Sequence, residues 1–389
     1  MAAPGNISDP MNSTYEIVRY EPGLKKQVID LQFHLWSPTA ALNTAYFEWK
    51  FERNPYVAEP LAYIAMHNGK AVGMRGFFGM QLEGGIPTQR SIVPCADDLV
   101  IAPEHRNRGL IPRIMSASFE DLAKLGYRYV FNLGAGSITF LSSLATGWRS
   151  VGLMQPMRRP SWQSDLRHRR DALIQRLPKI IGRGDRFARR WLERKRASLA
   201  DIRAERAKRR LSDVPWIHFE NFPRSAAMAE LAATCGDSRI RHVRDREYFD
   251  WCFQNPLSRY RFLFWEKARL EGYLVLQESA SHYAKDVVNI VDWEARSLAI
   301  QADLLKAALK VAGNRNLNIW SVSLPSQATG ILEANGFELE PPPRSATQRR
   351  RALLVRSVHD EEPPGDMRLA DQPLFDMKSW DLRMLYALE

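Results

Sequence analysis

The residues with the clearest chemical potential lie in one stretch, from Asp97 to Pro112. An apolar strand is followed by a polar loop, and a helix is expected to begin at Pro112, because a first helical turn does not need the missing N–H. The loop leaves backbone N–H groups unpaired at the positive end of that helix, an arrangement that binds phosphate groups. Gly109 allows a ligand close to the backbone, and Arg106 and Arg108 add positive charge. The stretch therefore predicts a pyrophosphate-binding loop.

This stretch resembles the GNAT superfamily of acyl-CoA-dependent acyltransferases, whose strand, loop and helix read V-x-P-x-x-[RQ]-x-x-G-x-[GA]. At those positions the chain supplies Ile101, Pro103, Arg106, Gly109 and Ile111. The last small residue of the pattern is therefore replaced by isoleucine. Gly147-Trp148 follows at the place where the family usually has Gly-Phe.

The resemblance implies a donor slot at the edge of this strand. In the family the strand splays from its neighbour, here Tyr127–Leu133, and the pantetheine arm of CoA pairs with the opened edge like an added strand. A backbone N–H near Leu99 to Ile101 would then polarise the thioester carbonyl. The residues expected to bind acyl-CoA by resemblance are Leu99, Val100, Ile101, Arg106, Asn107, Arg108, Gly109, Leu110, Ile111, Pro112 and Asn132. Acyl-CoA is expected as a co-substrate, with no permanently bound cofactor.

Two adjacent carboxylates, Asp97 and Asp98, lie on the strand that enters the splay. An amine acceptor must lose a proton, and these carboxylates precede the carbonyl-polarising backbone by a few residues. Strand alternation puts them on opposite faces, so at most one faces the acceptor. Asp97 is the first candidate for a general base and Asp98 the second; a water relay beside two structural carboxylates is the alternative. Cys95, on the face of Asp97, falls where some family members place a glutamate base.

The usual acid for the leaving thiolate is absent. Many family members carry a tyrosine four residues before the Gly-Phe, and Ser143 occupies that position here. Ser143 is therefore the catalytic candidate on the leaving-group side. A thiolate with a pKa of about 8.5 can leave unaided, so the missing tyrosine does not exclude catalysis.

The chain contains an internal repeat. Tyr46-Phe-Glu-Trp-Lys-Phe-Glu-Arg-Asn-Pro55 is echoed by Tyr248-Phe-Asp-Trp-Cys-Phe-Gln-Asn-Pro256, and a β-hairpin is predicted after each. Because the box also occurs in the half without a phosphate loop, packing explains it better than catalysis. In that half the corresponding strand runs into Trp293-Glu-Ala-Arg296 without a glycine. We therefore expect a non-catalytic copy; an unrelated α/β domain is the alternative.

These patterns predict an α/β protein with two tandem GNAT-like domains, each a mixed twisted sheet flanked by helices. The expected parts are a catalytic domain with the CoA loop over 1–157, a basic amphipathic helical linker over 158–214, a degenerate GNAT-like domain over 215–358 and an acidic C-terminal tail over 359–389. The end of the tail, from Trp380, is predicted to be a docking helix, with the linker as one place to dock.

The positive charge of the chain is concentrated in the linker. The net charge is +11, and arginines alternate there with Trp, Phe and Leu over 162–210. Such a pattern is typical of a helix lying on an anionic membrane surface. The alternative is an apolar stripe packed on the domains, with solvated arginines. Nucleic-acid binding is disfavoured, because the basic faces come with apolar stripes and not with exposed stacking aromatics.

The composition limits the other classes. The three cysteines, Cys95, Cys235 and Cys252, show no metal-ligand or disulfide spacing, so no metal site is expected and a reducing, cytoplasmic compartment fits best. No signal peptide and no long apolar run is present in the sequence. The expected location is cytoplasmic, or peripheral at the inner membrane surface if the linker binds lipid.

The predicted function is N-acylation of a primary amine by acyl-CoA. One finer interpretation is transfer of a long acyl chain to a membrane-associated lipid amine such as a sphingoid base, as in bacterial ceramide synthases, which resemble GNAT enzymes. Another is N-acetylation of a small amine, amino sugar or peptide. A non-catalytic CoA-binding or membrane-attached scaffold is the third hypothesis.

Overall fold

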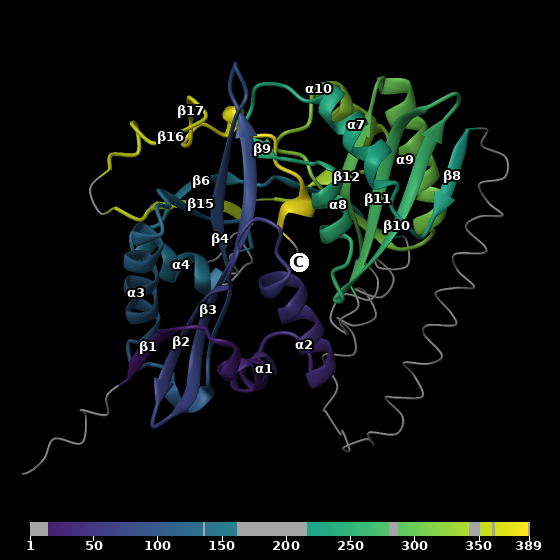
Figure 1. Ribbon diagram of the computed structural model, residues 1–389. Coiled ribbons are helices and arrows are strands. Elements are labelled where there is room, and N and C mark those ends of the chain that lie inside the picture. The colour runs from purple at the N-terminus through teal and green to yellow at the C-terminus, as the bar shows by residue number, and fades with distance from the viewer. Residues whose placement is uncertain are drawn as a thin grey trace, which may run out of the picture.

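Helices flank two mixed β-sheets, as predicted (Figure 1). The computed structural model describes residues 15–134, 137–161, 216–279, 287–341, 351–359 and 362–387. Predictions about the basic linker fall almost entirely on residues outside these ranges. Among the described residues, no helix has both the length and the apolar composition needed to cross a lipid bilayer.

The first sheet carries the predicted phosphate loop. In spatial order its strands are β1 (Glu16–Arg19), β2 (Leu61–His67), β3 (Lys70–Gly84), β4 (Gln89–Ile101), β5 (Tyr129–Asn132), β15 (Ala352–Ser357) and β6 (Arg149–Leu153). Strands β2 and β3 form the predicted hairpin around Asn68 and Gly69. Both turn residues have positive φ, 48° and 73°, which a two-residue type I′ turn requires.

Helices cover both faces of this sheet (Figure 1). On one face lie α1 (Lys25–Gln32), α2 (Ala40–Phe47) and the π-helix η2 (Glu48–Glu52); on the other lie α3 (Leu110–Lys124) and α4 (Ser137–Ala145). Two glycines of β3 identify the faces. A side chain at Gly73 would meet Ile114 of α3, whereas one at Gly76 would meet Phe51 of η2.

The second sheet repeats much of this plan. In spatial order its strands are β14 (Glu338–Leu339), β7 (Pro156–Arg159), β13 (Asn316–Trp320), β12 (Val287–Ala295), β11 (Leu270–Ser279), β10 (Ser258–Glu266) and β8 (Ile217–Glu220). Its helices are α7 (Ser225–Cys235), α8 (Arg246–Cys252), α9 (Leu298–Ala312) and α10 (Ser326–Ala334).

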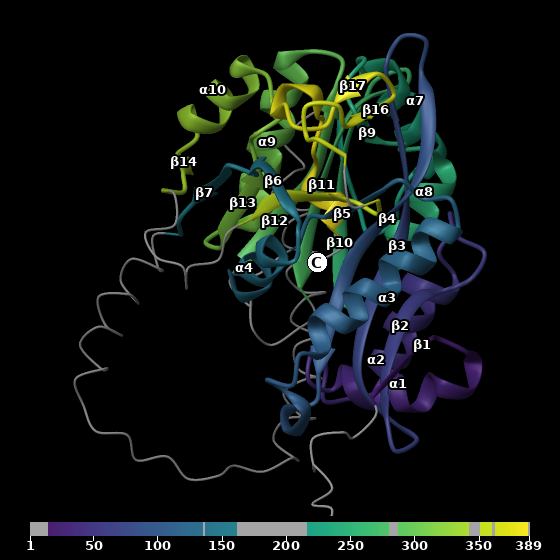
Figure 2. The same cartoon turned by 90° about the vertical axis from the view of Figure 1, so that its left-hand side faces the viewer.

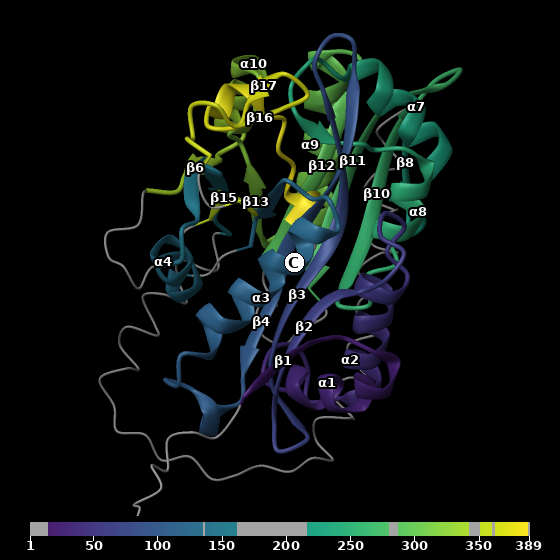
Figure 3. The ribbon, with the colours of Figure 1, turned by 60° about the vertical axis from the view of Figure 1, so that its left-hand side comes forward.

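The two halves exchange a strand. β7 lies between β13 and β14 in the second sheet (Figure 2). β15 lies between β5 and β6 in the first sheet, and Figure 3 shows it beside β6. The expected boundaries at 157 and 358 therefore do not follow the sheets, because β15 falls in the predicted second domain and β7 is divided. A short additional strand, β9 (Arg241–His242), pairs with β3 at Leu82 and Glu83. The halves are thus joined by backbone hydrogen bonds as well as by packing.

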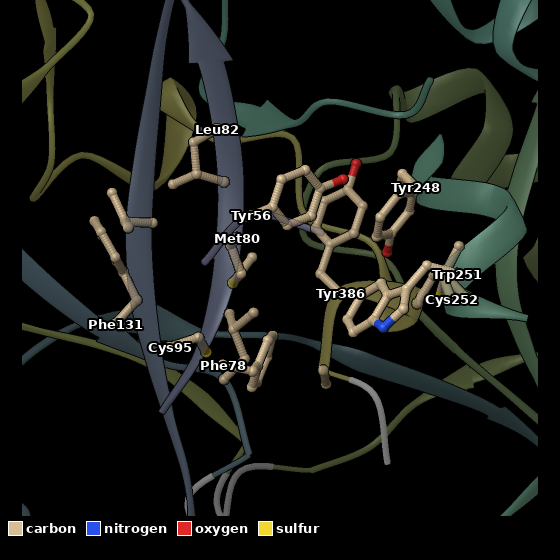
Figure 4. Close-up of a cluster of buried hydrophobic side chains, with 14 of the residues drawn as sticks. Tyr56, Phe78, Met80, Leu82, Cys95, Phe131, Tyr248, Trp251, Cys252 and Tyr386 are labelled. Carbon is tan, nitrogen blue, oxygen red and sulfur yellow. The ribbon is translucent and has the colours of Figure 1, made fainter. Parts of the chain in front are cut away.

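The repeated box packs at the contact between the halves. Trp49 and Trp251 stack with ring centroids 5.2 Å apart and 16° between planes. Each indole N–H donates to the backbone carbonyl of the other tryptophan, at 2.8 and 2.9 Å. Nearby, Tyr56 from the first half approaches Trp251 and Tyr248 from the second (Figure 4). The box therefore has a packing role, as predicted, and each box packs against its copy in the other half.

The C-terminal segment, residues 362–387, begins beside the first sheet, and its end, from Trp380, lies between the halves (yellow in Figure 1). It holds the strands β16 (Arg368–Leu369) and β17 (Gln372–Pro373) and the 3-10 turns η4 (Met377–Ser379) and η5 (Met384–Ala387). The α-helix predicted from Trp380 is therefore wrong for the described residues. Trp380 is buried, contacts Phe131 at 5.5 Å between ring centroids, and accepts a hydrogen bond from Ser323 on its backbone oxygen at 3.0 Å. Contacts with both halves, and not the hydrogen bonds of an α-helix, hold the segment from Trp380.

Candidate active site

Strand β4 carries a β-bulge at Asp98. Gly76 of β3 faces Asp97 and Arg75 faces Leu99, so Asp98 is an extra residue on β4, and its φ is 48°. A bulge turns the local backbone and re-aims side chains. The prediction that Asp97 and Asp98 point to opposite faces is therefore wrong, because both carboxylates contact the same ammonium group.

That ammonium group belongs to Lys50, which the π-helix η2 places against β4. Its side chain is 0% exposed and forms ion pairs with Asp97 and, at 3.1 Å, with Asp98. It also donates to the hydroxyl of Tyr46 at 2.7 Å. Burial acts to lower the pKa of Lys50, but Asp97 and Asp98 together raise it well above the ordinary value. The cluster therefore holds a permanently charged lysine.

The two carboxylates differ in their access to solvent. Asp98 is fully buried and accepts hydrogen bonds from Gln32 at 3.1 Å and Trp36 at 3.2 Å. Burial raises the pKa of Asp98, against the lowering effect of Lys50. The side chain of Asp97 is 17% exposed and is the one that an acceptor could reach. Cys95 is buried, and this burial raises its thiol pKa far above the ordinary value, so it is not poised as a base.

Strands β4 and β5 separate where the resemblance predicts a splay. Their one paired position among the described residues is Cys95 with Phe131. β4 continues to Ile101, so the predicted donor residues Leu99, Val100 and Ile101 have no partner on β5. Asn132 is buried at the end of β5, and its side-chain oxygen accepts a hydrogen bond from the backbone N–H of Gly134 at 3.0 Å. Asn132 thus shapes the turn that leaves the strand.

The loop after β4 ends in an uncapped helix. Gly109 is the N-cap of α3 with a φ of 68°, and no side chain caps the first turn. The helix begins at Leu110, two residues before the predicted start, and Ile111 and Pro112 complete its first turn. Asn107 also has a positive φ, 61°. Apart from its chain neighbours, none of the described residues lies within 4 Å of the place that a side chain at Gly109 would occupy. The uncapped first turn beside this open space has the properties that an anion site requires.

The arginines of the loop are held at its base. Arg106 donates to the backbone oxygen of Ile101 at 3.1 Å, and Arg108 donates to the hydroxyl of Tyr15 at 3.3 Å. Tyr15 also accepts, on its backbone oxygen, a hydrogen bond of 2.6 Å from Arg113. Three guanidinium groups therefore surround the loop, and Arg113 was not among the predicted ligands.

Ser143 lies in the last turn of α4. Its backbone oxygen accepts from the N–H groups of Thr146 at 2.9 Å and Trp148 at 3.1 Å, and Gly147 has a φ of 87°. The predicted helix stop is therefore present. Ser143 is buried, and the described residues give its hydroxyl no hydrogen bond. A groove of about 610 Å³ runs between α3 and α4 from Pro112 to the end of β15.

In the second half, the junction between strand and helix that corresponds to the one between β4 and α3 is short and capped. β12 ends at Ala295 and α9 begins at Leu298, with the Ser297 hydroxyl accepting from the backbone N–H of Ile300 at 3.3 Å. Within the described part, no glycine and no loop separate this strand from its helix. Arg383 of the C-terminal segment donates to the backbone oxygen of Trp293 at 3.1 Å. The free edge of β12 is thus covered by the chain itself.

Lys50 is the functional residue that sequence reasoning missed. It belongs to the repeated box, which the sequence assigns to packing alone. The second half has Cys252 at the equivalent position. A lysine replacing a cysteine inside an otherwise matching apolar box was the available signal.

No protein-family model matches the chain, and no curated protein matches its sequence. Solved structures do resemble it. A GCN5-related N-acetyltransferase from Anabaena variabilis aligns with a TM-score of 0.54 at 11% identity, over 89% of this chain and 73% of that one. A probable N-acyltransferase of unknown function from Enterococcus faecalis gives 0.54 at 12% identity, over 89% and 72%. A tandem GNAT protein from the clavulanic acid biosynthesis pathway gives 0.50 at 12% identity, over 90% of this chain and all of that one.

These likenesses show that the fold of the chain, mixed α/β with two mixed sheets, is similar to that of GNAT proteins, a tandem one among them, as the loop and the repeat predicted. At 11–12% identity they indicate the fold of the chain but do not identify its substrate. None of the three is described as acting on a lipid, so the ceramide-synthase interpretation gains no support from them.

Proposed function

We propose that this protein is an acyl-CoA-dependent N-acyltransferase whose first half binds the donor and performs the transfer. The observation that carries the proposal is the uncapped N-terminus of α3, preceded by Gly109 and following a strand that has separated from β5. A phosphate site next to an unpaired strand edge fits a donor with a diphosphate and an amide-bearing arm.

The donor would lie across both features. The amides of the loop and of Leu110 would hold the pyrophosphate, with Arg106 and Arg108 nearby. The pantetheine would follow the edge of β4, where a backbone N–H next to the bulge polarises the thioester carbonyl. The bulge supports this arrangement because it turns peptide groups out of the regular ladder.

Asp97 is the proposed general base. The amine nitrogen attacks the thioester carbon and loses a proton to the Asp97 carboxylate; the C–S bond then breaks and CoA leaves as the thiolate. Lys50 holds Asp97 in place, while Asp98, enclosed by Gln32 and Trp36, fixes Lys50. Among the described residues the hydroxyl of Ser143 has no hydrogen bond that would position it as an acid, so the thiolate leaves unaided in this mechanism.

Calorimetric titration of the purified protein with acetyl-CoA tests the donor site. Gly109→Trp fills the open space at the loop and is expected to weaken binding by at least about tenfold. Gly126→Trp is the matched control, because Gly126 also has positive φ, 86°, and open space, but lies just after the other end of α3. No binding by the unaltered protein, or equal loss in both variants, would overturn the proposal.

The acceptor and the acyl length define the finer alternatives. Affinity that rises from acetyl- through octanoyl- to palmitoyl-CoA would favour a lipid amine, and equal affinity would favour a small polar amine. The membrane part of the lipid hypothesis concerns residues 162–210, outside the described residues. Binding without release of free CoA thiol, for every amine offered, would leave the scaffold hypothesis.

A further inference from the structure

Arg75, in the middle of β3, is a buried cation that forms no direct ion pair with any of the described residues, although Asp97 and Asp98 act on it electrostatically. The residue is 2% exposed, and its Nε atom has no hydrogen-bond acceptor. The guanidinium lies over the face of the Phe77 ring, 5.7 Å from its centroid. The buried cations Lys50 and Arg244 differ, because Lys50 forms ion pairs with two carboxylates and Arg244 with three.

The guanidinium lies on the donor face of the first sheet. Side chains alternate along a strand, so Arg75 shares the face of Gly73 and Phe77, which is the face of α3. Asp97 and Lys50 meet on the opposite face, against η2. Arg75 therefore lies on the side from which the loop at the start of α3 would deliver acyl-CoA, and away from the proposed acceptor side.

Along the strand, Arg75 lies at the level proposed for the acyl group of the donor. Arg75 is paired with Leu99, directly beyond the bulge, where β4 has lost β5 as a neighbour. The pyrophosphate loop begins only after Ile101, beyond the end of β4, and has its own amides and arginines. A charge at the level of Leu99 is thus placed to meet the acyl end of the donor.

A buried charge that forms no ion pair is costly, and a ligand of opposite charge can complete the pair. Burial lowers the pKa of Arg75 to about 10, against the raising effect of Asp97 and Asp98, so the guanidinium stays protonated at neutral pH. A guanidinium presents a planar fork that matches a carboxylate in two parallel hydrogen bonds.

We propose that Arg75 selects a donor whose acyl group ends in a carboxylate, a dicarboxylic acid bound to CoA through one end. This inference rests on the proposed function and names the donor class of the same site. The reaction is unchanged in its balance. The amine nitrogen bonds to the thioester carbon, the CoA thiolate leaves, and the distal carboxylate stays in the amide product.

Succinyl-CoA and butyryl-CoA test the proposal, because their acyl groups have the same number of carbons and differ in the terminal carboxylate. Each is titrated calorimetrically into the unaltered protein, Arg75→Met, Arg75→Lys, and Arg149→Met as the control for loss of an exposed positive charge. We expect succinyl-CoA to bind at least tenfold more tightly than butyryl-CoA to the unaltered protein and to Arg149→Met. The preference should vanish in Arg75→Met and be reduced in Arg75→Lys.

Other outcomes separate this inference from the proposed function. Equal binding of both donors by the unaltered protein would overturn the carboxylate proposal and leave the acyltransferase intact, whereas no binding of either would remove both. If Arg75→Met slows turnover of both donors alike without changing the affinity ratio, Arg75 acts on the thioester oxygen and the selection proposal fails. Arg75→Met should also melt at a higher temperature without donor. If it fails to fold, Arg75→Lys carries the comparison.

Discussion

The two halves treat the same junction in opposite ways. In the first half, residues 102–109 separate β4 from α3, and the helix begins at a glycine without a side-chain cap. In the second, residues 296–297 separate β12 from α9, and the Ser297 hydroxyl satisfies an amide of the first turn. The first N–H groups of a helix have no partner within the helix and need hydrogen-bond acceptors from outside it. Among the described residues, no side chain meets that need in the first half, whereas the second half meets it internally.

The clusters of buried charges near the ends of β4 and β12 also differ, because one is partly open to solvent and the other is closed. Asp98 and Asp292 each lie three residues before the end of their strand, and each meets a buried cation. In the first half that cation is Lys50, and its second carboxylate partner remains partly exposed. In the second half Arg244 joins Asp292 to Glu294 at 2.7 Å, and Arg383 seals the cluster. Only the first arrangement, within the described residues, keeps a carboxylate within reach of an acceptor.

Removing the cation of the first half should have the largest effect. Lys50→Met leaves Asp97 and Asp98 facing each other without a counter-charge, and we expect about 3–5 kcal/mol of lost unfolding free energy, measured by urea titration. Lys25→Met is the matched control. Lys25 also pairs with two carboxylates, of Glu48 and Glu52, but is partly exposed, so its loss should stay below about 1 kcal/mol. Similar losses in the two variants would show that burial does not distinguish these clusters.

Removing the accessible carboxylate should reduce activity more than stability. Asp97→Asn keeps the shape of the side chain but loses the ion pair with Lys50, and we expect turnover of the folded protein to fall about 100-fold or more, as for loss of a general base. Asp292→Asn, the counterpart of Asp98 in the second half, should leave turnover of the folded protein unchanged. The measurement is release of CoA thiol with a saturating amine. Unchanged turnover in both Asp97→Asn and Asp98→Asn would assign the proton to a water relay.

His242, which lies at the contact between the halves, should make the stability of the fold depend on pH. Burial, with Arg244 adding to it, lowers the pKa of His242 to about 3, although a hydrogen bond between Nδ1 and the Val243 carbonyl at 2.8 Å opposes the shift. The unfolded chain, with a pKa near 6.5, then binds more protons between pH 6.5 and 3. The stability present above about pH 6.5 is therefore lost as pH falls towards 3, by about 2 kcal/mol at pH 5.

His242→Phe separates this contribution from the other acid-sensitive groups. The phenyl ring can keep the stacking on Tyr248, whose ring centroid lies 4.0 Å away, but does not titrate. Urea unfolding at pH 7 and pH 5 should show a smaller loss for the variant than for the unaltered protein. Parallel losses would mean that His242 is not the group that couples the contact to pH.

Local physics explains why the start of α3 was predictable and the contacts of Lys50 were not. A glycine ahead of a helix is its neighbour in sequence, so its place at the helix N-terminus follows from helix geometry alone. The bulge at Asp98 exists only relative to β3, because one strand has a residue that its partner lacks. Strict alternation therefore misplaced the two carboxylates. Lys50 reaches them from a distant segment, and only its contrast with Cys252 in the repeat marks it.

The strand exchange was invisible for a related reason. β7 and β15 are short strands, and the residues of neither strand specify a sheet. Their assignment depends on which edge is free after the whole chain has folded. Trp380 misled in the same way: an apolar stretch of the tail suggested a helix, but contacts with Phe131, Leu374 and Ser323 fix it in an irregular path. Tertiary contacts overrode the local preference.

The smallest expected effect lies at the capped junction of the second half. Ser297→Ala removes the acceptor for the Ile300 amide and should cost about 1 kcal/mol of stability, whereas Ser297→Gly should cost only a few tenths, as is usual at an N-cap. Neither variant should change acetyl-CoA affinity, because this helix end serves the fold. Urea unfolding and calorimetry on the same samples check both parts. A weaker affinity for acetyl-CoA in Ser297→Ala would place the donor at α9 and reverse the assignment of roles to the two halves.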